Sequence, residues 1–326
     1  NNNVTTNDVT NNGGKGIELD SSNNNDVIEN NATDGNDQGI DLQDANGNDV
    51  IENNASANKF TGIDIEVSSN NTVTGNKVSD NFDGMVLDRV SRDNNVTANN
   101  VSGNSIMGIA IFASSDNNDF TDNTARNNAD SDFRIDGSSN NVVENLDIGA
   151  STASDTTLDF IGNNFQLSGN STPPADPQGE QNISRFVEAT NTSATGSFLD
   201  ITFGYAKSDV SGVDETNLDI WRNSTTWTEL GGTVDTTNNE VRYNITDFGS
   251  VFAPLAGPDS VRGAPGAGGD CINRRNIGRG QEGQECPRDR GLGRGGSREE
   301  LDRETGRNSD TARRDRGRGE RGGRSR

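Results

Sequence analysis

Apolar residues recur along the first 150 residues at a nearly constant interval. Their spacings are 23, 23, 23, 23, 24 and 22, and the series is Val4, Val27, Val50, Val73, Val96, Phe120 and Val142. Asparagine stands two positions before each member, at Asn2, Asn25, Asn48, Asn71, Asn94, Asn118 and Asn140. It stands again three positions after each member, from Asn7 to Asn145. A fixed period of this length indicates a repeat architecture with one structural unit per repeat.

A second pattern in the same repeats predicts short strands. A glycine is followed by an apolar, polar, apolar triplet, as in Gly62 with Ile63, Asp64 and Ile65. Side chains alternate between the two faces of a strand, so the outer members of each triplet point inward and the middle member points outward. A third inward position per repeat is Val9, Ala32, Ala55, Val78, Val101 and Ala125.

These patterns together specify a coil that rises by one strand spacing, about 4.8 Å, per repeat. Asparagine at one corner of every coil can stack its amide on the amides above and below, so that each donor and acceptor is used. The leucine-dense consensus of leucine-rich repeats is missing. We therefore predict that residues 1–155 form a parallel β-helix of six to seven coils with about 23 residues per coil.

The repeat N-N-x-V-x-x-N, seen at Asn70 to Asn76, and the motif G-I-x-L identify a resemblance to a known family. They resemble the right-handed parallel β-helix repeats of NosD-like periplasmic copper-binding proteins and of related carbohydrate-binding and sugar-hydrolase proteins. The resemblance implies the fold, since such repeats encode coil geometry and serve many functions. Copper binding would need His, Cys or several Met, and this stretch offers only Met85 and Met107.

Longer strand signals replace the 23-residue period after the β-helix. Seven short apolar segments separated by turns predict a β-sandwich over residues 156–257. The segment Asp209 to Glu215, with Trp221 and Trp227, resembles a domain found near the C-terminus of archaeal cell-surface proteins.

Residues 258–326 are rich in Gly and Arg and are predicted to be a disordered tail. Such a tail can bind nucleic acid, but this function suits an acidic exterior protein poorly. The alternatives are that the tail is a linker or that it is translated from the wrong reading frame.

The charge distribution narrows the choice of partners. Residues 1–258 carry 11 Lys and Arg against 39 Asp and Glu, whereas residues 259–326 carry 17 against 12. An acidic body of this kind is typical of an extreme halophile's protein and repels nucleic acid and anionic membranes. We therefore expect a polysaccharide, a surface glycan or a protein as partner.

Other features of composition favour an exterior protein. Eleven Asn-x-Ser/Thr sites suit an extracellular or cell-surface location. No signal peptide and no membrane span is visible. Both cysteines, Cys271 and Cys286, lie in the basic tail, so none is available to the acidic body. The chain contains no histidine, which excludes imidazole catalysis and His-ligated metals.

Acidic residues gather on the outward side of the predicted Gly-x-x-x strands. The candidates for binding a ligand or a cation are Glu18, Asp20, Asp41, Asp64 and Glu66. Carboxylates stacked about 5 Å apart repel one another, and Ca²⁺ with mixed carboxylate, amide and water ligands would relieve the repulsion. The alternative is a solvated acidic surface adapted to high salt. The calcium repeat signature G-G-x-G-x-D is absent, which favours this alternative.

Candidates for catalysis are few. β-Helix lyases and epimerases that act on uronates pair acidic residues or Ca²⁺ with a basic group, and Asp88 beside Arg89 is the best such pair here. The coils vary too little in length to provide loops that would wall a cleft. We therefore favour a non-enzymatic protein for surface attachment or glycan recognition. The alternative is a polysaccharide lyase or C5-epimerase-like enzyme, or a fragment of one, acting on an extracellular polyuronate.

Overall fold

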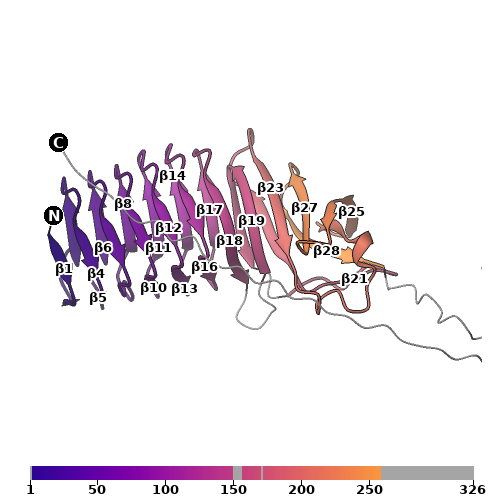
Figure 1. Cartoon of the computed structure of the whole chain (residues 1–326), viewed down its shortest axis with the longest axis horizontal. Helices are drawn as coiled ribbons and strands as arrows, with labels where there is room; N and C mark the ends of the chain where they lie inside the picture. The colour runs from indigo at the N-terminus through magenta and orange to yellow at the C-terminus, as the bar shows by residue number, and fades with distance from the viewer. Residues whose placement is uncertain (1, 150–155, 170–171, 258–326) are drawn as a thin grey trace, which may run out of the picture. The chain divides into compact units, whose positions relative to one another are not determined.

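The computed structural model describes residues 2–149, 156–169 and 172–257, which belong to one compact unit. The predicted disordered tail, residues 258–326, lies outside the described residues. Apart from one short 3₁₀ helix, η1 (Glu215–Asn217), the regular structure of the described part is entirely β. The all-β prediction is confirmed, and the N-terminal part is a solenoid of about six turns with about 23 residues per turn (Figure 1).

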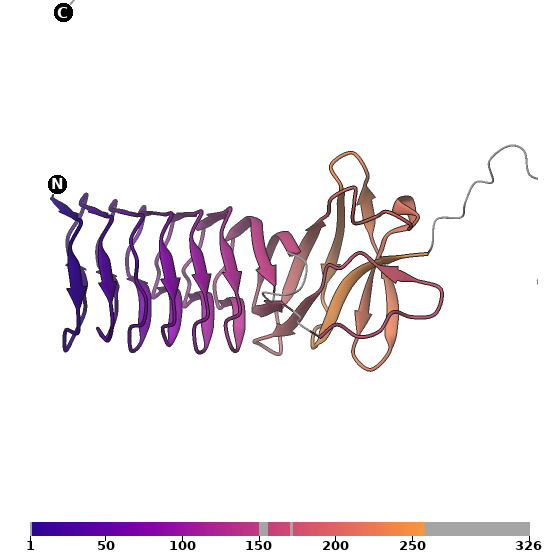
Figure 2. The ribbon, with the colours of Figure 1, turned by 90° about the horizontal axis from the view of Figure 1, so that it is seen from below.

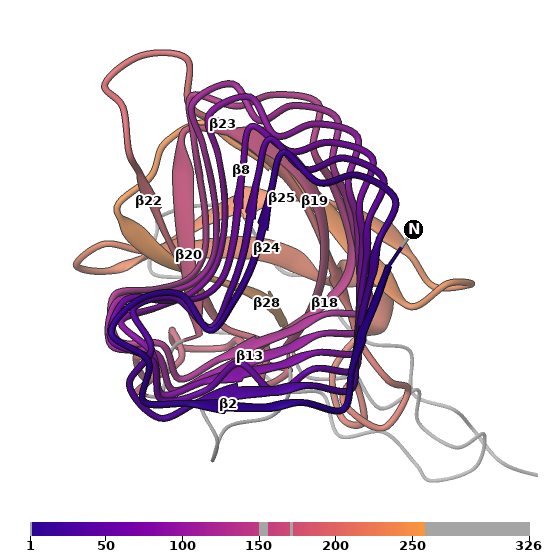
Figure 3. The ribbon, with the colours of Figure 1, turned by 90° about the vertical axis from the view of Figure 1, so that its left-hand side faces the viewer.

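The coils of the solenoid have three faces, which Figure 3 shows end on, and on the third face one coil contributes only an isolated bridge at Asn54. Sheet A contains β1 (Asn3–Thr5), β4 (Asp26–Ile28), β7 (Asp49–Ile51), β9 (Thr72–Thr74), β12 (Asn95–Thr97), β15 (Asp119–Thr121) and β18 (Val142–Gly149). Sheet B contains β3 (Ile17–Asp20), β6 (Ile40–Gln43), β8 (Thr61–Glu66), β11 (Asp83–Asp88), β14 (Met107–Phe112) and β17 (Ser131–Asp136). The third face contains β2 (Asp8–Thr10), β5 (Asn31–Thr33), β10 (Lys77–Ser79), β13 (Asn100–Ser102) and β16 (Thr124–Arg126).

The core lies where the triplet pattern places it. Successive strands pair in parallel with every inward residue facing its equivalent one coil away, as Ile63 faces Met85. Both of these side chains are fully buried. Glycine precedes the triplet because the chain turns a tight corner there: a Cβ on Gly84 would lie 2.5 Å from the carbonyl oxygen of Gly108. No other residue fits such a contact without a shift of the backbone.

Asparagine ladders run along the corners of the solenoid. The Asn71 side chain accepts from the backbone N–H and the amide of Asn48, at 2.8 and 3.2 Å. Its own amide donates to the carbonyl of Ala45 at 3.0 Å and to Asn94 at 3.0 Å. The same contacts repeat from coil to coil, so a polar side chain is buried with its donors and acceptors used.

The last coil corrects the predicted register. The seventh member of the ladder is Asn141 and not Asn140, because Asn118 donates to Asn141 at 2.9 and 3.0 Å. Phe120 pairs with Val143, so Val143 points into the core and Val142 points outward. The asparagine series predicted to run from Asn7 to Asn145 ends one coil early, at Asn123. Asn145 is exposed, and the buried neighbour Leu146 fills the core there.

Two further ladders follow the same period and were not predicted. One is a third asparagine series, whose last member donates to Asp132: Asn36, Asn58, Asn81, Asn104 and Asn128. The other is a serine series: Ser68, Ser91, Ser115 and Ser138. Their spacings of 22 to 24 residues were visible in the sequence.

Both sheets continue beyond the solenoid with antiparallel pairing (Figure 2). Sheet A is extended by β19 (Thr156–Asn163), β23 (Phe198–Gly204), β27 (Glu240–Ile245) and β26 (Thr233–Asp235). Sheet B is extended by β20 (Phe165–Gly169), β22 (Val187–Asn191), β28 (Ser250–Ala256), β24 (Asp219–Asn223) and β25 (Trp227–Gly231), with β21 (Gln181–Asn182) beside β28. One hydrophobic core runs through the solenoid and into the space between these extensions. Edge-to-face contacts link Phe120, Phe133, Phe160 and Phe165 along that core.

Candidate ligand-binding faces

The outward side chains of sheet B form two rows, with one member of each row per coil. The first row is Glu18, Asp41, Asp64, Val86, Ala110 and Arg134. The second row is Asp20, Gln43, Glu66, Asp88, Phe112 and Asp136. Neither row contains an asparagine, although asparagine dominates the rest of the repeat. The strand pairing thus places the predicted carboxylates on one surface, here named the acidic face: Glu18, Asp20, Asp41, Asp64, Glu66 and Asp88.

Lys15 lies at the N-terminal end of the acidic face. Its Nζ is 2.7 Å from a carboxylate oxygen of Glu18 and 2.6 Å from one of Asp41. Asp41 is only 2% exposed, and burial raises its pKa while the contact with Lys15 opposes the rise. The ammonium group therefore occupies the gap in which the sequence suggested a calcium ion. In the described part of the chain, no three Asp, Glu, His or Cys side chains are grouped in a way that could hold a metal.

Asp64 follows Asp41 on the next coil and lacks such a partner. Within the described residues, its side chain has one polar contact, from the amide of Gln38 at 3.4 Å. Burial raises the pKa of Asp64 to about 6, and the nearby carboxylates Asp41, Glu66 and Asp88 add to the rise. Asp64 is thus a carboxyl group whose charged form is disfavoured by its surroundings, which is a common property of residues in functional sites.

The predicted acid–base pair is not isolated from other groups. Arg89 makes its short ion pair with Glu66 on the preceding coil, and its Nε is 3.8 Å from Asp88. The guanidinium is largely exposed. Asp83, which was not among the candidates, has a pKa raised by burial. It lies at the start of β11 and accepts from the backbone N–H of Met107 at 3.4 Å.

Exposed apolar side chains flank the last two strands of the acidic face. Phe60 and Phe82, which are 56% and 48% exposed, precede β8 and β11. They lie on adjacent coils, since the N–H of Phe82 donates to the carbonyl of Phe60 at 2.9 Å. Val67 and Val90, 44% and 46% exposed, follow the same strands. Both valines have a left-handed backbone, with φ of 53° and 74°. We name these four residues the apolar rims.

The conformation of the two rim valines is unfavourable. A β-branched residue with positive φ is strained by roughly 1 to 3 kcal/mol. Equivalent turns in this chain use residues that tolerate the conformation better, such as Ser21, Asp44 and Gly137. The fold therefore does not require apolar, branched residues at the rims.

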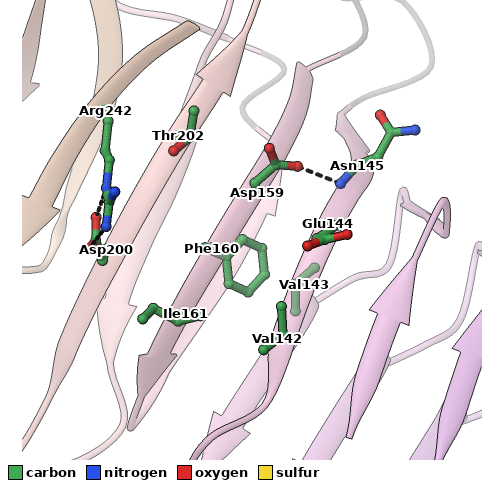
Figure 4. Close-up of a pocket in the computed structure, with 10 residues that line it drawn as sticks. All are labelled: Val142, Val143, Glu144, Asn145, Asp159, Phe160, Ile161, Asp200, Thr202 and Arg242. Carbon is green, nitrogen blue, oxygen red and sulfur yellow. Dashed lines mark hydrogen bonds and ion pairs between the residues drawn. The ribbon is translucent and has the colours of Figure 1, made fainter. Parts of the chain in front are cut away.

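A second surface lies on sheet A, where the solenoid meets its antiparallel extension. A depression of about 440 Å³ is lined by ten residues (Figure 4): Val142, Val143, Glu144, Asn145, Asp159, Phe160, Ile161, Asp200, Thr202 and Arg242. We name it the junction trough. The predicted register pointed Val142 into the core, so this surface could not be recognised from the repeat alone.

Comparisons with known proteins agree with the geometry of the solenoid. The family model described as the right handed beta helix region matches residues 1–125. This part of the chain is a right-handed β-helix. The matched segment covers all of the acidic face and its rims. A comparison with curated proteins finds no match for the chain.

Several solved structures are similar to part of the chain. A periplasmic alginate epimerase is 27% identical over 41% of this chain and 33% of its own, with a TM-score of 0.39. The A-module of an Azotobacter vinelandii mannuronan C-5 epimerase is 18% identical over 46% of each chain, with a TM-score of 0.43. The Dettilon tailspike protein is 13% identical over 75% of this chain and 65% of its own, with a TM-score of 0.36. The chain thus spans about a third of the length of the first epimerase. The described residues include no helix of the length and apolarity that a membrane span requires.

Proposed function

We propose that this chain is a non-enzymatic, extracellular carbohydrate-binding protein that contacts a glycan through the acidic face. The observation that carries the proposal is the coincidence of two unfavourable features on the same two coils. Asp64 is a half-buried carboxyl group without an ion-pair partner among the described residues, and strained valines and exposed phenylalanines flank its strand and the next. Neither feature stabilises the solenoid, so a ligand explains them better than the fold does.

The chemistry of the face fits a chain of sugar units lying along the solenoid axis. Carboxylates accept hydrogen bonds from hydroxyl groups, and an aromatic ring packs against the apolar C–H face of a sugar. Phe60 and Phe82 on one rim, with Glu66 and Asp88 between the rims, repeat these groups on two adjacent coils. A polymer with a matching repeat can make the same contacts on successive coils. Polyuronates are disfavoured because their carboxylates would meet those of the face.

The charge of the chain suits attachment to a surface at high salt. The net charge of −23 keeps the protein hydrated where salt screens its self-repulsion. In this proposal the solenoid is a rigid spacer whose acidic face holds a neutral glycan outside the cell. An extreme halophile is the setting in which such a surface is most stable.

A second candidate is a polyuronate lyase or C5-epimerase, and the raised pKa of Asp64 favours it, since a carboxyl group with a pKa of about 6 can exchange protons near neutral pH. The neighbouring basic groups oppose it. Lys15 is held by two carboxylates, and Arg89 is paired with Glu66. Both tyrosines, Tyr205 and Tyr243, lie outside the solenoid, and the chain has no histidine.

Direct binding measurements test the proposal. The full-length protein in molar KCl is titrated calorimetrically with neutral hexasaccharides (cellohexaose, xylohexaose, mannohexaose) and with oligomannuronate. We expect a neutral probe to bind, and Phe82→Ser to weaken that binding by roughly tenfold or more. Phe198→Ser is the matched control, because Phe198 is 40% exposed and lies on β23, away from sheet B. Equal weakening by both variants, or binding of oligomannuronate alone, would contradict the proposal.

Turnover assays separate the two candidates. The protein is incubated with polymannuronate and polyguluronate, and unsaturated products and hydrogen exchange at C5 are followed. We expect neither. Turnover that is lost in Asp64→Asn would replace the binding function with the enzymatic one.

A further inference from the structure

The junction trough carries a second inference. Its central depression of about 440 Å³ adjoins two others of about 420 and 530 Å³. The first neighbour shares Asn145 and Asp159 with it, and the second shares Asp200 and Arg242. The three depressions therefore form one elongated surface across β18, β19, β23 and β27.

The outward residues of sheet A change character where the trough begins. Through the solenoid, one outward row is polar on every coil: Asn3, Asp26, Asp49, Thr72, Asn95 and Asp119. The next two members across the strands are Val142 and Ile161, which pair with each other and are 36% and 44% exposed. A polar residue would serve the fold equally well at both positions. The fold therefore does not explain why both residues are apolar, and a ligand of the trough would.

Polar groups surround this apolar pair in fixed positions. Arg242 donates through both Nε and Nη2 to the carboxylate of Asp200, the Nε contact being 2.7 Å. One oxygen of Asp159 accepts from the backbone N–H of Asn145 at 2.6 Å. Figure 4 shows Asp159 and Asn145 above the apolar pair, Asp200 and Thr202 together on the neighbouring strand β23, and Arg242 on β27 beyond it. Apolar surface bordered by a few oriented donors and acceptors is the usual composition of a small-molecule site.

We propose that the junction trough binds an uncharged oligosaccharide of about three sugar units, one for each depression. The C–H face of the central unit packs on Val142 and Ile161, and its hydroxyl groups bond to Asp159, Asp200 and Thr202. An extended peptide is a poorer occupant, because this is the face of a sheet whose backbone groups already pair between strands. An anionic glycan is disfavoured by the carboxylates of Glu144, Asp159 and Asp200. The site does not depend on the acidic face, and the two together would make the molecule bivalent.

Stoichiometry and matched variants test the inference. The full-length protein is titrated in molar KCl with the trisaccharides cellotriose, xylotriose and mannotriose, which are long enough for the trough. Ile161→Asp places a charge on the apolar pair, and we expect it to weaken binding to the trough by roughly tenfold or more. Val67→Asp is the control, since Val67 has the same 44% exposure but lies on the rim of the acidic face. We expect Val67→Asp to leave binding to the trough unchanged.

The outcomes separate this inference from the proposed function. Loss of binding in Ile161→Asp alone supports the trough, and loss in Val67→Asp alone overturns it while leaving the acidic face as a glycan site. If no trisaccharide binds the wild type, the inference is also wrong. Should Ile161→Asp fail to fold, Thr202→Val removes one hydroxyl contact with little change of shape, and unchanged binding in that variant overturns the inference.

Discussion

The asparagine corners and the acidic face repeat at the same interval on the same coils, yet stacking has opposite effects on the two. An amide is both donor and acceptor, so each rung such as Asn71 satisfies the next one. A carboxylate only accepts, so Asp41 and Asp64 on adjacent coils repel each other, and this repulsion adds to the rise that burial produces in the pKa of Asp64. The corners therefore stabilise the solenoid, whereas the charged form of Asp64 destabilises it. Under the proposed function, this carboxyl group is retained because it binds a ligand.

The largest effect is expected from breaking a corner. Asn71→Leu removes four hydrogen bonds and leaves the backbone N–H of Asn48 and the carbonyl of Ala45 without partners in a buried place. We expect the free energy of unfolding to fall by about 2 to 4 kcal/mol. Urea denaturation checks this, with Asn100→Leu at an exposed strand position as control. Equal midpoints for the two variants would show that the ladder contributes little.

The corrected register gives a sharper test at neighbouring positions. Asn141→Asp buries a charge and loses the donation to the carbonyl of Ser115, at 3.0 Å. We expect a loss of about 2 kcal/mol. Asn140→Asp should change the free energy of unfolding by less than about 0.5 kcal/mol, since Asp93 holds the equivalent corner with a similar φ of 55°. A lower melting midpoint for Asn140→Asp than for Asn141→Asp would show that Asn140 is the ladder residue, as the sequence predicted.

A substitution on the acidic face should raise the free energy of unfolding, whereas the corner substitutions lower it. The pKa of Asp64 is raised in the folded state, so between pH 4 and 6 the folded protein binds more protons than the unfolded chain. Protonated Asp64 is compatible with the folded state at low pH. As the pH rises through about 6, Asp64 becomes charged and the free energy of unfolding falls. At pH 7 we expect Asp64→Asn to stabilise the protein by about 1 to 3 kcal/mol. At pH 4 the two proteins should unfold alike in urea, and a constant difference at all pH values would contradict the assignment.

Ions should have the smallest effect. Carboxylates about 5 Å apart repel by roughly 1 kcal/mol per pair in water, and molar salt screens most of this. We expect the melting midpoint to rise with KCl, and Ca²⁺ and Mg²⁺ to act alike at fixed ionic strength. A shift produced by Ca²⁺ alone, and abolished in Asp41→Asn with Asp64→Asn, would show a specific metal site that the arrangement of Lys15 does not suggest.

The sequence predicted those parts of the fold in which equivalent positions of every coil need the same type of residue. The period, the inward triplets and the carboxylates on one face all follow from positions 22 to 24 residues apart. The last coil was misaligned because Asn140-Asn141 and Val142-Val143 are doublets that fit either of two registers. The junction trough was invisible, since its residues come from strands that pair only after the repeat has ended.

The electrostatics of the acidic face were predictable only in part. The sequence shows that Asp41 and Asp64 are neighbours, but not that Asp41 is buried against Lys15, 26 residues earlier. The strain at Val67 and Val90 was also hidden, because the sequence does not reveal the sign of φ at a turn. Burial and backbone conformation depend on the whole coil and not on one repeat.

The central claim is that the acidic face gives up stability in order to bind a glycan, and Asp64→Asn tests both halves of it in one protein. The measurement is the thermal midpoint of wild type and variant at pH 7, without and with the neutral hexasaccharide that the wild type binds. We predict a higher midpoint for the free variant and a smaller rise on addition of the sugar. A variant that is stabilised yet gains as much from the sugar as the wild type would show that the acidic face is only solvated surface.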